Sequence, residues 1–456
     1  TENVTELGDP AVGIHVDGVY VARPQAANAL MFDLERTELT RGPQGTLYGR
    51  NSVVGTLNIV TAKPNFDIQG GSLNLVGGQL SEAGLRAHYN LPINEKLALR
   101  FAYMEQSKDS FLDGFWDGSQ LDWRRLPSNV RDQFEVITSP DQRSYLSDYA
   151  WYLGCSTLPG NGCGQGNFSD PYNKISADPS EFYTAIEDSA WRISATYVVD
   201  DNSDLNIQFE NYEDNGKGWT NVLSCELMRT RTGITAKDGA ANTCTDILGS
   251  ENRYQSFANT PGFNKMNIDS FRAIYKRQLN ETTNLTVNYG YQELEQSSQF
   301  EIDGGVNYQY GMAFNINRLL TESNVLDAYI TGANQEWAWV GGIFTSTEDN
   351  DMLANFTAEL NGHDFFWQPN RELNHYAVYG QATYALRDDL FFTVGGRLSY
   401  DEKSDVGGRN INCNSANGCY PQIYNTGGNP FDVINQLAPD YWIQMGKMID
   451  GVDCVA

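Results

Sequence analysis

The chain has 456 residues, a formal net charge of −27 and 12% aromatic residues, with a mean hydropathy of −0.47. So large a negative charge argues against a nucleic-acid partner and against attraction to an anionic membrane surface. No apolar run is long enough for a spanning helix, which excludes a helical membrane protein. Transmembrane β-barrels have this kind of composition, because only every second residue of their strands faces lipid.

The first 64 residues carry the most distinctive pattern of the chain. Val12–Arg23 comes first, and glycines then recur through Asp33–Pro64. Gly42 followed by Pro43 predicts a turn, since glycine tolerates positive φ and proline fixes its own. A phosphate-binding loop is not indicated, because the Gly-Lys-Ser/Thr ending is absent. Taken alone, the stretch also fits a compact α+β segment with many turns.

This stretch resembles the plug domain of TonB-dependent outer-membrane receptors, and Val12–Arg23 before it resembles the strand-turn-strand that precedes that segment in the same family. The residues that carry the resemblance are Arg41, Gly42, Pro43, Gly45, Tyr48, Gly49, Arg50, Gly55 and Asn58. The sequence departs from the family at Thr37, Thr40 and Val54, where an aliphatic residue, an aliphatic residue and a glycine are usual. Val54 matters most, since a β-branched residue does not easily take a positive φ.

After Pro64 the chain alternates between apolar and polar residues, which is typical of strands with one apolar face. Strand pairs joined by short turns are predicted at residues 85–91 and 97–103, 191–199 and 205–209, on both sides of 279–283, at 325–331 and 337–345, and at 376–386 and 390–400. Longer connections at about 108–183, 215–263 and around 304–305 separate these pairs, and 404–456 is expected to be a polar loop. This rhythm predicts an outer-membrane barrel with its turns on the periplasmic side and its loops outside.

We therefore predict an all-β chain with two domains. Residues 1–66 are expected to be the C-terminal part of a small mixed α+β plug domain. Residues 67–456 are expected to be about the first 11 strands of an antiparallel transmembrane β-barrel, ending in an extracellular loop. Barrels of the family have 22 strands, so the strands here should form a curved open sheet, and the TonB box and early plug strands are not in this sequence. A soluble all-β sandwich with aromatic core stripes is the alternative.

Six of the seven cysteines fall into close pairs within polar stretches, namely Cys155 with Cys163, Cys225 with Cys244, and Cys413 with Cys419. Disulfides that staple loops are the natural interpretation in an oxidising compartment, and we expect all three at the extracellular end. Metal ligation is the rival, but there is no Cys-x-x-Cys and the four histidines are scattered.

No motif of a hydrolase, metalloprotease or nucleotide-binding enzyme occurs in the sequence. We therefore expect no catalytic, cofactor-binding or metal-binding residues, and a protein that is not an enzyme.

The resemblance implies active import through the outer membrane. The ligand would bind outside, and the plug would rearrange when TonB transmits energy from the inner membrane. The expected partners are TonB, outer-membrane lipid and lipopolysaccharide, and a small extracellular ligand, with no nucleic acid. Family frequency favours a ferric-siderophore-type chelate; a carbohydrate or cobalamin is the alternative ligand, and a non-transporting adhesin or passive channel is the competing class.

Charged residues give two further expectations. In the family, plug charges contact acidic residues of the barrel wall, and the candidates for such a latch are Glu35, Arg36, Glu38, Arg41 and Arg50; ion pairing within the plug is equally compatible. The net charge of −27 disfavours strongly anionic ligands unless basic residues converge, for which the sequence offers Arg124, Arg125, Arg229 and Arg231.

Overall fold

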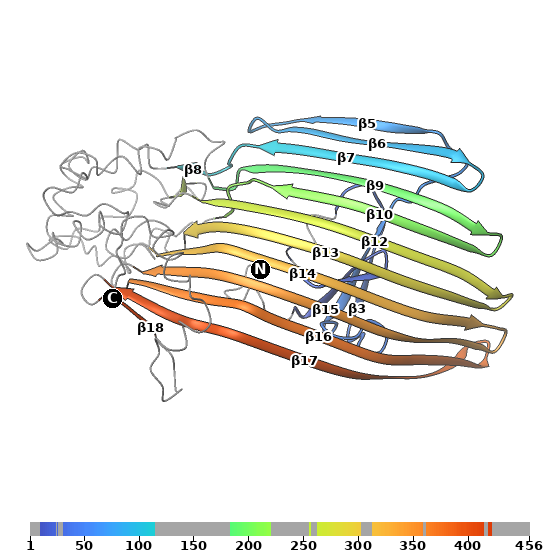
Figure 1. Cartoon of the computed structure of the whole chain (residues 1–456). Coiled ribbons are helices and arrows are strands. Elements are labelled where there is room, and N and C mark those ends of the chain that lie inside the picture. Colours follow the sequence, from blue (N-terminus) through green and yellow to red (C-terminus); the bar gives the residue numbers. More distant parts are fainter. Residues whose placement is uncertain are drawn as a thin grey trace, which may run out of the picture.

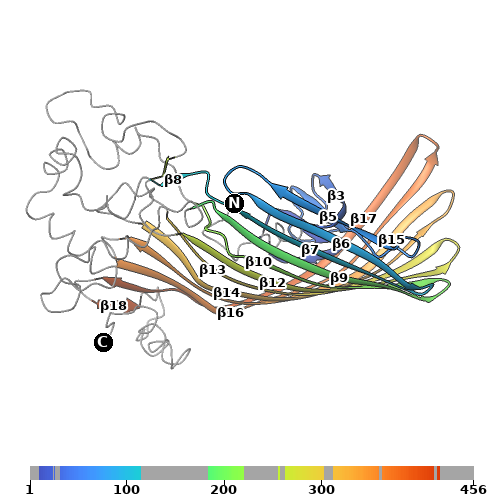
Figure 2. The ribbon, with the colours of Figure 1, turned by 90° about the horizontal axis from the view of Figure 1, so that it is seen from above.

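The computed structural model describes residues 10–23, 25, 31–114, 183–219, 255–256, 262–301, 312–358, 362–414 and 418–421. These residues form two main sheets, a small one near the N-terminus and a large curved one that surrounds it on one side (Figure 1, Figure 2).

The small sheet, which we call the plug sheet, has four strands in the order β2-β1-β4-β3. They are β1 (Val12–Val16), β2 (Val19–Val21), β3 (Leu34–Arg41) and β4 (Gly55–Thr61). β1 runs parallel to β4, and β3 runs antiparallel to it. The ends of β1 and β4 and the start of β3 therefore meet at one edge of the sheet. The described part of this segment contains strands and no helix, so the helical component of the predicted α+β plug is not seen there.

The large sheet, which we call the wall, has 12 strands in the order β18-β17-β16-β15-β14-β13-β12-β10-β9-β7-β6-β5. Eleven of them are long, as predicted: β5 (Gly70–Gly77), β6 (Ala83–Asn94), β7 (Leu97–Lys108), β9 (Ile186–Asp200), β10 (Ser203–Asp214), β12 (Phe263–Asn280), β13 (Thr283–Glu301), β14 (Met312–Ala333), β15 (Trp337–Ala358), β16 (Gly362–Arg387) and β17 (Leu390–Asn414). Neighbouring strands are antiparallel, and β5 lies at one edge and β18 at the other. The predicted open antiparallel sheet is thus confirmed.

Short turns join the long strands in pairs at one end of the wall (Figure 1). The two longest connections, between β7 and β9 and between β10 and β12, start from the other end, where β15 and β16 are only three residues apart. The strands are longer than predicted, because pairing with a neighbouring strand continues beyond the stretch in which apolar residues alternate. β16 has 26 residues, although the alternation covers only 376–386. The prediction that 404–456 is only a loop is wrong, because β17 continues to Asn414 and pairs with β18 (Gly418–Pro421). The predicted connections at 108–183 and 215–263 also contain β8 (Asp113–Gly114) and β11 (Gln255–Ser256), which pair in parallel.

The two faces of the wall differ in chemistry, as strand β10 shows. Phe209 faces outward and is 50% exposed, whereas its neighbours Gln208 and Glu210 face the plug sheet and are 0% and 2% exposed. Since successive side chains of a strand point to opposite faces, the outer face is apolar and the inner face carries polar and charged groups. Among the described residues, no helix has the length and hydropathy needed to cross a membrane.

The hydrophobic core lies between the plug sheet and the wall. Val16, Phe32 and Ile59 of the plug segment belong to one buried cluster with wall residues such as Ile268 and Leu294. Apolar burial therefore holds the plug sheet against the inner face, and the inward-facing charges of the wall must find partners on the plug.

Candidate functional site at the plug and wall junction

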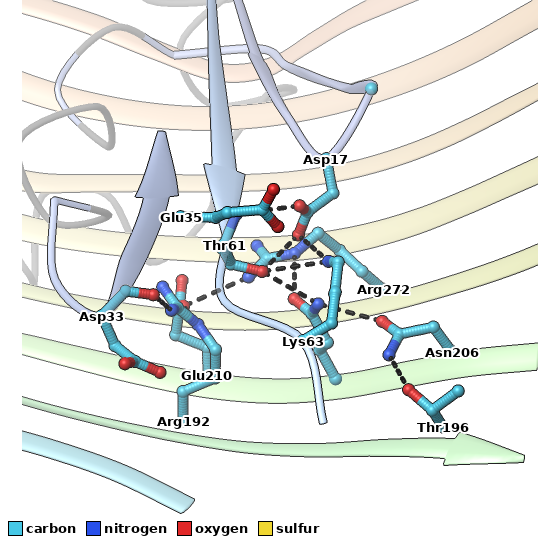
Figure 3. Close-up of polar contacts among 12 residues, drawn as sticks. Asp17, Asp33, Glu35, Thr61, Lys63, Arg192, Thr196, Asn206, Glu210 and Arg272 are labelled. Atoms are coloured by element: carbon cyan, nitrogen blue, oxygen red, sulfur yellow. Dashed lines mark hydrogen bonds and ion pairs between the residues drawn. The ribbon is translucent and has the colours of Figure 1, made fainter. Parts of the chain in front are cut away.

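Charged residues gather where the edge of the plug sheet meets wall strands β7, β9, β10 and β12 (Figure 3). We call this group the charged junction. It comprises Asp17, Asp33 and Lys63 of the plug segment and Arg100, Arg192, Glu210 and Arg272 of the wall. The four cations exceed the three carboxylates by one.

Local backbone geometry places the two plug carboxylates. Asp17 and Gly18 have φ of 53° and 85° between β1 and β2, which suits a two-residue hairpin turn with both central residues at positive φ. Asp33, with φ of 47°, immediately precedes β3. Both residues therefore lie at the plug edge where the central strands end.

Asp33 and Arg100 form a bidentate ion pair between the plug and β7. The Nε and Nη2 atoms of Arg100 donate to the two carboxylate oxygens of Asp33 at 2.8 and 2.6 Å. Their side chains are 9% and 13% exposed, so the pair is largely shielded from solvent. Such a fork-to-carboxylate arrangement fixes geometry as well as contributing attraction.

The side chain of Arg192 binds the backbone of the same plug segment. Its Nη1 atom donates to the carbonyl oxygens of Phe32 and Asp33 at 3.1 and 3.3 Å, and its guanidinium carbon lies 4.3 Å from the centre of the Phe32 ring. Glu210 forms ion pairs with both Arg192 and Arg272, and Arg272 also donates to the Gln208 side chain at 3.2 Å. One wall carboxylate thus lies between two wall guanidinium groups.

Asp17 binds two residues at the end of β4 and just beyond it, Thr61 and Lys63. Its carboxylate accepts hydrogen bonds from the backbone N–H and the hydroxyl of Thr61 at 3.0 and 2.7 Å, and lies 2.7 Å from Lys63 Nζ. Gln208 of the wall donates to the same Thr61 hydroxyl at 3.1 Å.

Burial and charge shift both ionisable groups of this pair. Burial lowers the pKa of Lys63 to about 8, and the charge of Asp17 opposes that shift. Burial acts to raise the pKa of Asp17, but the charges of Lys63 and Arg272 and the hydrogen bonds from Lys63 and Thr61 together outweigh it and hold the pKa below its ordinary value. The pair therefore depends on its mutual attraction for its charges to persist in a buried place.

A second contact joins residues 42–54, the motif loop, to strands β16 and β17. Gly49 has a φ of 75°, and a Cβ atom there would lie 2.7 Å from the guanidinium of Arg397. Arg397 lies over the rings of Phe344 and Tyr379 at 5.3 and 5.2 Å and donates to His375 Nε2 at 3.2 Å. The positive φ favours glycine, and a Cβ atom would also require the flexible end of the Arg397 side chain to move.

A third contact is the buried ion pair between Arg23, just beyond β2, and Glu348 on β15. Asn350 donates to the Glu348 carboxylate at 2.8 Å. The plug thus contacts strands in both halves of the wall, β7 to β12 in one half and β15 to β17 in the other.

The residues of the predicted plug motif have mainly structural surroundings. Gly42 turns the chain with a φ of 86°, and a Cβ on Gly55 would collide with the carbonyl oxygen of Thr40. Pro43 and Gly45 lie in the motif loop, where a Cβ on Gly45 would meet open space. Tyr48 packs edge-on against His15 at 5.0 Å, and Asn58 donates to Glu38 at 2.9 Å.

The departure at Val54 leaves the turn intact. Val54 is not among the described residues with positive φ. Its N–H donates to the carbonyl of Ala11 at 3.1 Å, and its carbonyl accepts from the N–H of Gly42 at 2.9 Å. The position therefore does not require glycine in this chain.

The predicted latch residues are not the ones that form the described ion pairs between the plug and the wall. On β3, Arg36 pairs with Glu35 and Glu38 at 2.6 and 2.7 Å, and all three side chains are more than 40% exposed. Arg41 is the exposed last residue of β3, and Arg50 lies close enough to His375 for their charges to interact. The described wall contacts come instead from residues that our sequence analysis did not single out, chiefly Asp17, Arg23, Asp33 and Lys63. A signal existed on the wall, where Arg100 and Arg192 occupy the polar face of apolar alternating strands.

Of the predicted disulfide partners, Cys413 and Cys419 are directly opposite each other across β17 and β18. Cys155, Cys163, Cys225 and Cys244 lie outside the described residues, as do the basic residues Arg124, Arg125, Arg229 and Arg231.

Comparison with known proteins adds sequence and fold relatives. No family model matches the chain. The chain is 41% identical over 91 residues to the pesticin receptors of Yersinia enterocolitica and Yersinia pestis, which is 20% of this chain and 13% of theirs. It is 32% identical over 103 residues to the ferrioxamine B receptor of Salmonella typhimurium, which is 21% of this chain and 14% of that protein.

Solved receptors share the fold over most of the chain. The ferric yersiniabactin uptake receptor of Yersinia pestis matches with a TM-score of 0.59 and 15% identity, covering 91% of this chain and 51% of the receptor. The ferric-catecholate import receptor of E. coli K12 in its open form matches with a TM-score of 0.58 and 12% identity, covering 92% and 57%. This chain therefore spans about half of these solved receptors and a smaller share of the sequence relatives. The matches confirm the predicted plug-and-barrel fold.

Proposed function

We propose, on the premise that this chain is part of a TonB-dependent outer-membrane receptor, that the whole receptor imports a ferric-siderophore-type chelate with energy transmitted by TonB. The observation that supports it is a plug sheet fastened to the inner face of a transmembrane wall through the charged junction. Such a plug closes the barrel in the resting state, so import requires it to move. The relatives named for pesticin and ferrioxamine B are receptors as well, and neither name describes an enzyme.

The proposed domain boundary separates residues 1–66 from 67–456. β4 of the plug sheet ends at Thr61 and β5 of the wall begins at Gly70, so the connection is short. In this arrangement the apolar outer face of the wall contacts outer-membrane lipid and lipopolysaccharide, and the end with the long connections faces outside and receives the ligand.

Arg41 and Arg50 retain a proposed role as a latch between the plug and acidic residues of the barrel. Charge reversal at Arg41 in the full-length receptor is expected to loosen the plug and reduce uptake. If plug retention and uptake both stay at the wild-type level after Arg41→Glu, the latch role is wrong.

The function is tested by iron uptake in cells. The full-length receptor is expressed in a Gram-negative host that lacks its own siderophore receptors, and radiolabelled iron is supplied as a panel of chelates. We expect uptake of at least one chelate in cells with TonB, none in matched cells without it, and induction of the native gene by iron starvation. Induction by an oligosaccharide with indifference to iron, cobalamin uptake, or an open-channel conductance without TonB would each contradict the proposal.

A further inference from the structure

Three arginines form a diagonal row on the inner face of the wall. Arg100 on β7 is opposite Ser194, two residues from Arg192 on β9. Arg192 is opposite Glu210 on β10, and Arg272 on β12 is opposite Gln208, two residues from Glu210. Residues two apart on a strand share a face, so the row crosses four strands on the side that faces the plug. We call these three residues the arginine row.

The plug presents oxygen atoms to the arginine row. Arg100 binds the carboxylate of Asp33, and Arg192 binds the backbone carbonyls of Phe32 and Asp33. Asp17 lies close enough to Arg272 for their charges to interact. These are the contacts that an anionic, oxygen-rich ligand would make with the same guanidinium groups.

The wall by itself does not neutralise the row. Within the described part of the wall, Arg192 and Arg272 both pair with one carboxylate, that of Glu210. The Arg192 side chain is buried, yet its Nη2 atom has no hydrogen-bond partner among the described residues, and neither does Oε1 of the adjoining Glu210. A buried donor without a partner is costly, and it can donate to a ligand that reaches it. Fastening the plug therefore does not use the full donor capacity of the row.

We propose that the arginine row is an anion-binding site on the import path, which the plug's oxygen atoms cover in this structure and an anionic iron chelate contacts when the plug has moved. The proposal rests on the proposed function and deepens it by naming the ligand's charge. The ligand class is a chelate with exposed carboxylate or catecholate oxygens. A local cluster of positive charge also offsets the repulsion between an anionic ligand and a chain with a net charge of −27.

The test compares variants of the full-length receptor at one position of the row. Arg272→Gln removes the charge, Arg272→Lys keeps it without the planar fork, and Arg277→Gln is the matched control. Arg277 lies on the same strand β12 but pairs with Asp200 beside a short turn. Uptake of iron is measured with a negatively charged ferric tricatecholate, an uncharged ferric trihydroxamate and positively charged ferrioxamine B.

We expect the wild type to import the negatively charged chelate. In Arg272→Gln the maximal uptake rate of that chelate should fall roughly tenfold, the equivalent of one charge-assisted hydrogen bond, with binding to the cell surface unchanged. Arg272→Lys should recover most of the rate, and Arg277→Gln should match the wild type. Outer-membrane insertion and protease resistance of each variant establish that it has folded.

Two outcomes would overturn the inference. One is a wild type that imports only uncharged or positively charged chelates, in which case the proposed function stands and the anion site fails. The other is an equal loss in Arg272→Gln and Arg272→Lys together with leakage of a neutral dye, which means that Arg272 only fastens the plug. A wild type that imports no iron chelate fails the proposed function instead.

A second readout does not depend on iron. Purified full-length receptor is placed in a planar bilayer, its plug is loosened with urea, and ion selectivity is taken from the reversal potential in a potassium chloride gradient. We expect the potential of Arg272→Gln to shift toward cation selectivity relative to wild type and Arg277→Gln. An unchanged potential contradicts an anion site at the row.

Discussion

Asp33 and Arg100 lie 67 residues apart in the chain, yet the two carboxylate oxygens of Asp33 accept hydrogen bonds at 2.6 and 2.8 Å from the same guanidinium. Asp33 immediately precedes β3, and Arg100 is the fourth residue of β7. The pair therefore ties the start of a plug strand to the wall at one point with fixed geometry.

Removing either partner of this pair should loosen the plug. We expect a double-mutant cycle of Asp33→Asn and Arg100→Gln to give a coupling energy of about 2 kcal/mol, as for a shielded, charge-assisted pair. The measurement is the unfolding of the plug by denaturant in the refolded full-length receptor, with protease cleavage within the plug as the readout. The matched control is the cycle of Arg36→Gln and Glu38→Gln on exposed β3, for which no measurable coupling is expected. Equal coupling in both cycles would contradict a special role for Asp33.

His15 should make the plug sensitive to acid. It is 5% exposed, and burial lowers its pKa to about 4. The folded plug keeps His15 neutral while the unfolded chain binds a proton below about pH 6.5, so acidification favours unfolding. Between pH 6.5 and 4.5 this residue should remove about 2 kcal/mol from the free energy of unfolding.

The measurement for His15 is the unfolding midpoint of the plug across that pH range in wild type and His15→Phe. Phenylalanine keeps an aromatic ring between Tyr20 and Tyr48 and cannot titrate. The variant should lose this part of the pH dependence, and parallel profiles would show that His15 does not carry it.

Lys63 should react as an unusually acidic amine. Burial lowers its pKa to about 8 and Asp17 raises it, so Asp17→Asn should lower the pKa further. The unprotonated amine is the nucleophile, and the rate of acylation of Lys63 should therefore rise at lower pH in the variant than in wild type. Mass spectrometry of the Lys63 peptide after brief labelling at each pH gives the profile. A profile that moves to higher pH in Asp17→Asn would mean that the two charges do not attract each other.

Gly49 should not tolerate alanine. Its φ of 75° disfavours any residue with a Cβ atom, and the end of the Arg397 side chain would have to move. We expect Gly49→Ala to destabilise the plug by about 1–2 kcal/mol, mainly through the backbone strain. Gly45→Ala in the same loop meets open space and should cost little. The protease assay of plug unfolding compares the two variants, and similar stabilities would show that the motif loop yields to Arg397.

Cys413 and Cys419 should form a disulfide. Residues directly opposite in an antiparallel pair have Cα atoms about 4.5–5.5 Å apart, within the range of disulfides. Alkylation of the unfolded, unreduced receptor followed by mass spectrometry should leave both cysteines unmodified, and reduction should expose both. Alkylation of either thiol without reductant would contradict the bond. The same experiment tests the predicted pairs Cys155 with Cys163 and Cys225 with Cys244.

Local sequence was sufficient to predict the strands and the short turns of the wall. Alternation at 390–400 and 376–386 reflects which side chains face lipid, and that is a property of each strand alone. The same signal was insufficient for the strand ends. At β17 and β18 the strands continue past the stretch of alternating apolar residues into polar sequence, where no alternation marks them. Pairing with a neighbour extends those strands, and the neighbour is not visible in their own residues.

The plug is predicted from the resemblance of its motif to a known family. Two glycines of that motif, Gly42 and Gly49, have positive φ and so meet a local backbone requirement. The charged junction could not be predicted. Asp33 meets Arg100 across 67 residues and Arg192 meets Phe32 across 160, and the sequence around each charge is equally compatible with a solvated side chain. Of our latch candidates, Glu35, Arg36 and Glu38 pair with one another on β3. Only the seating of the plug edge against β7, β9, β10 and β12 decides which inward charges are buried together, because a buried charge must be neutralised by whatever group the folded chain brings within reach.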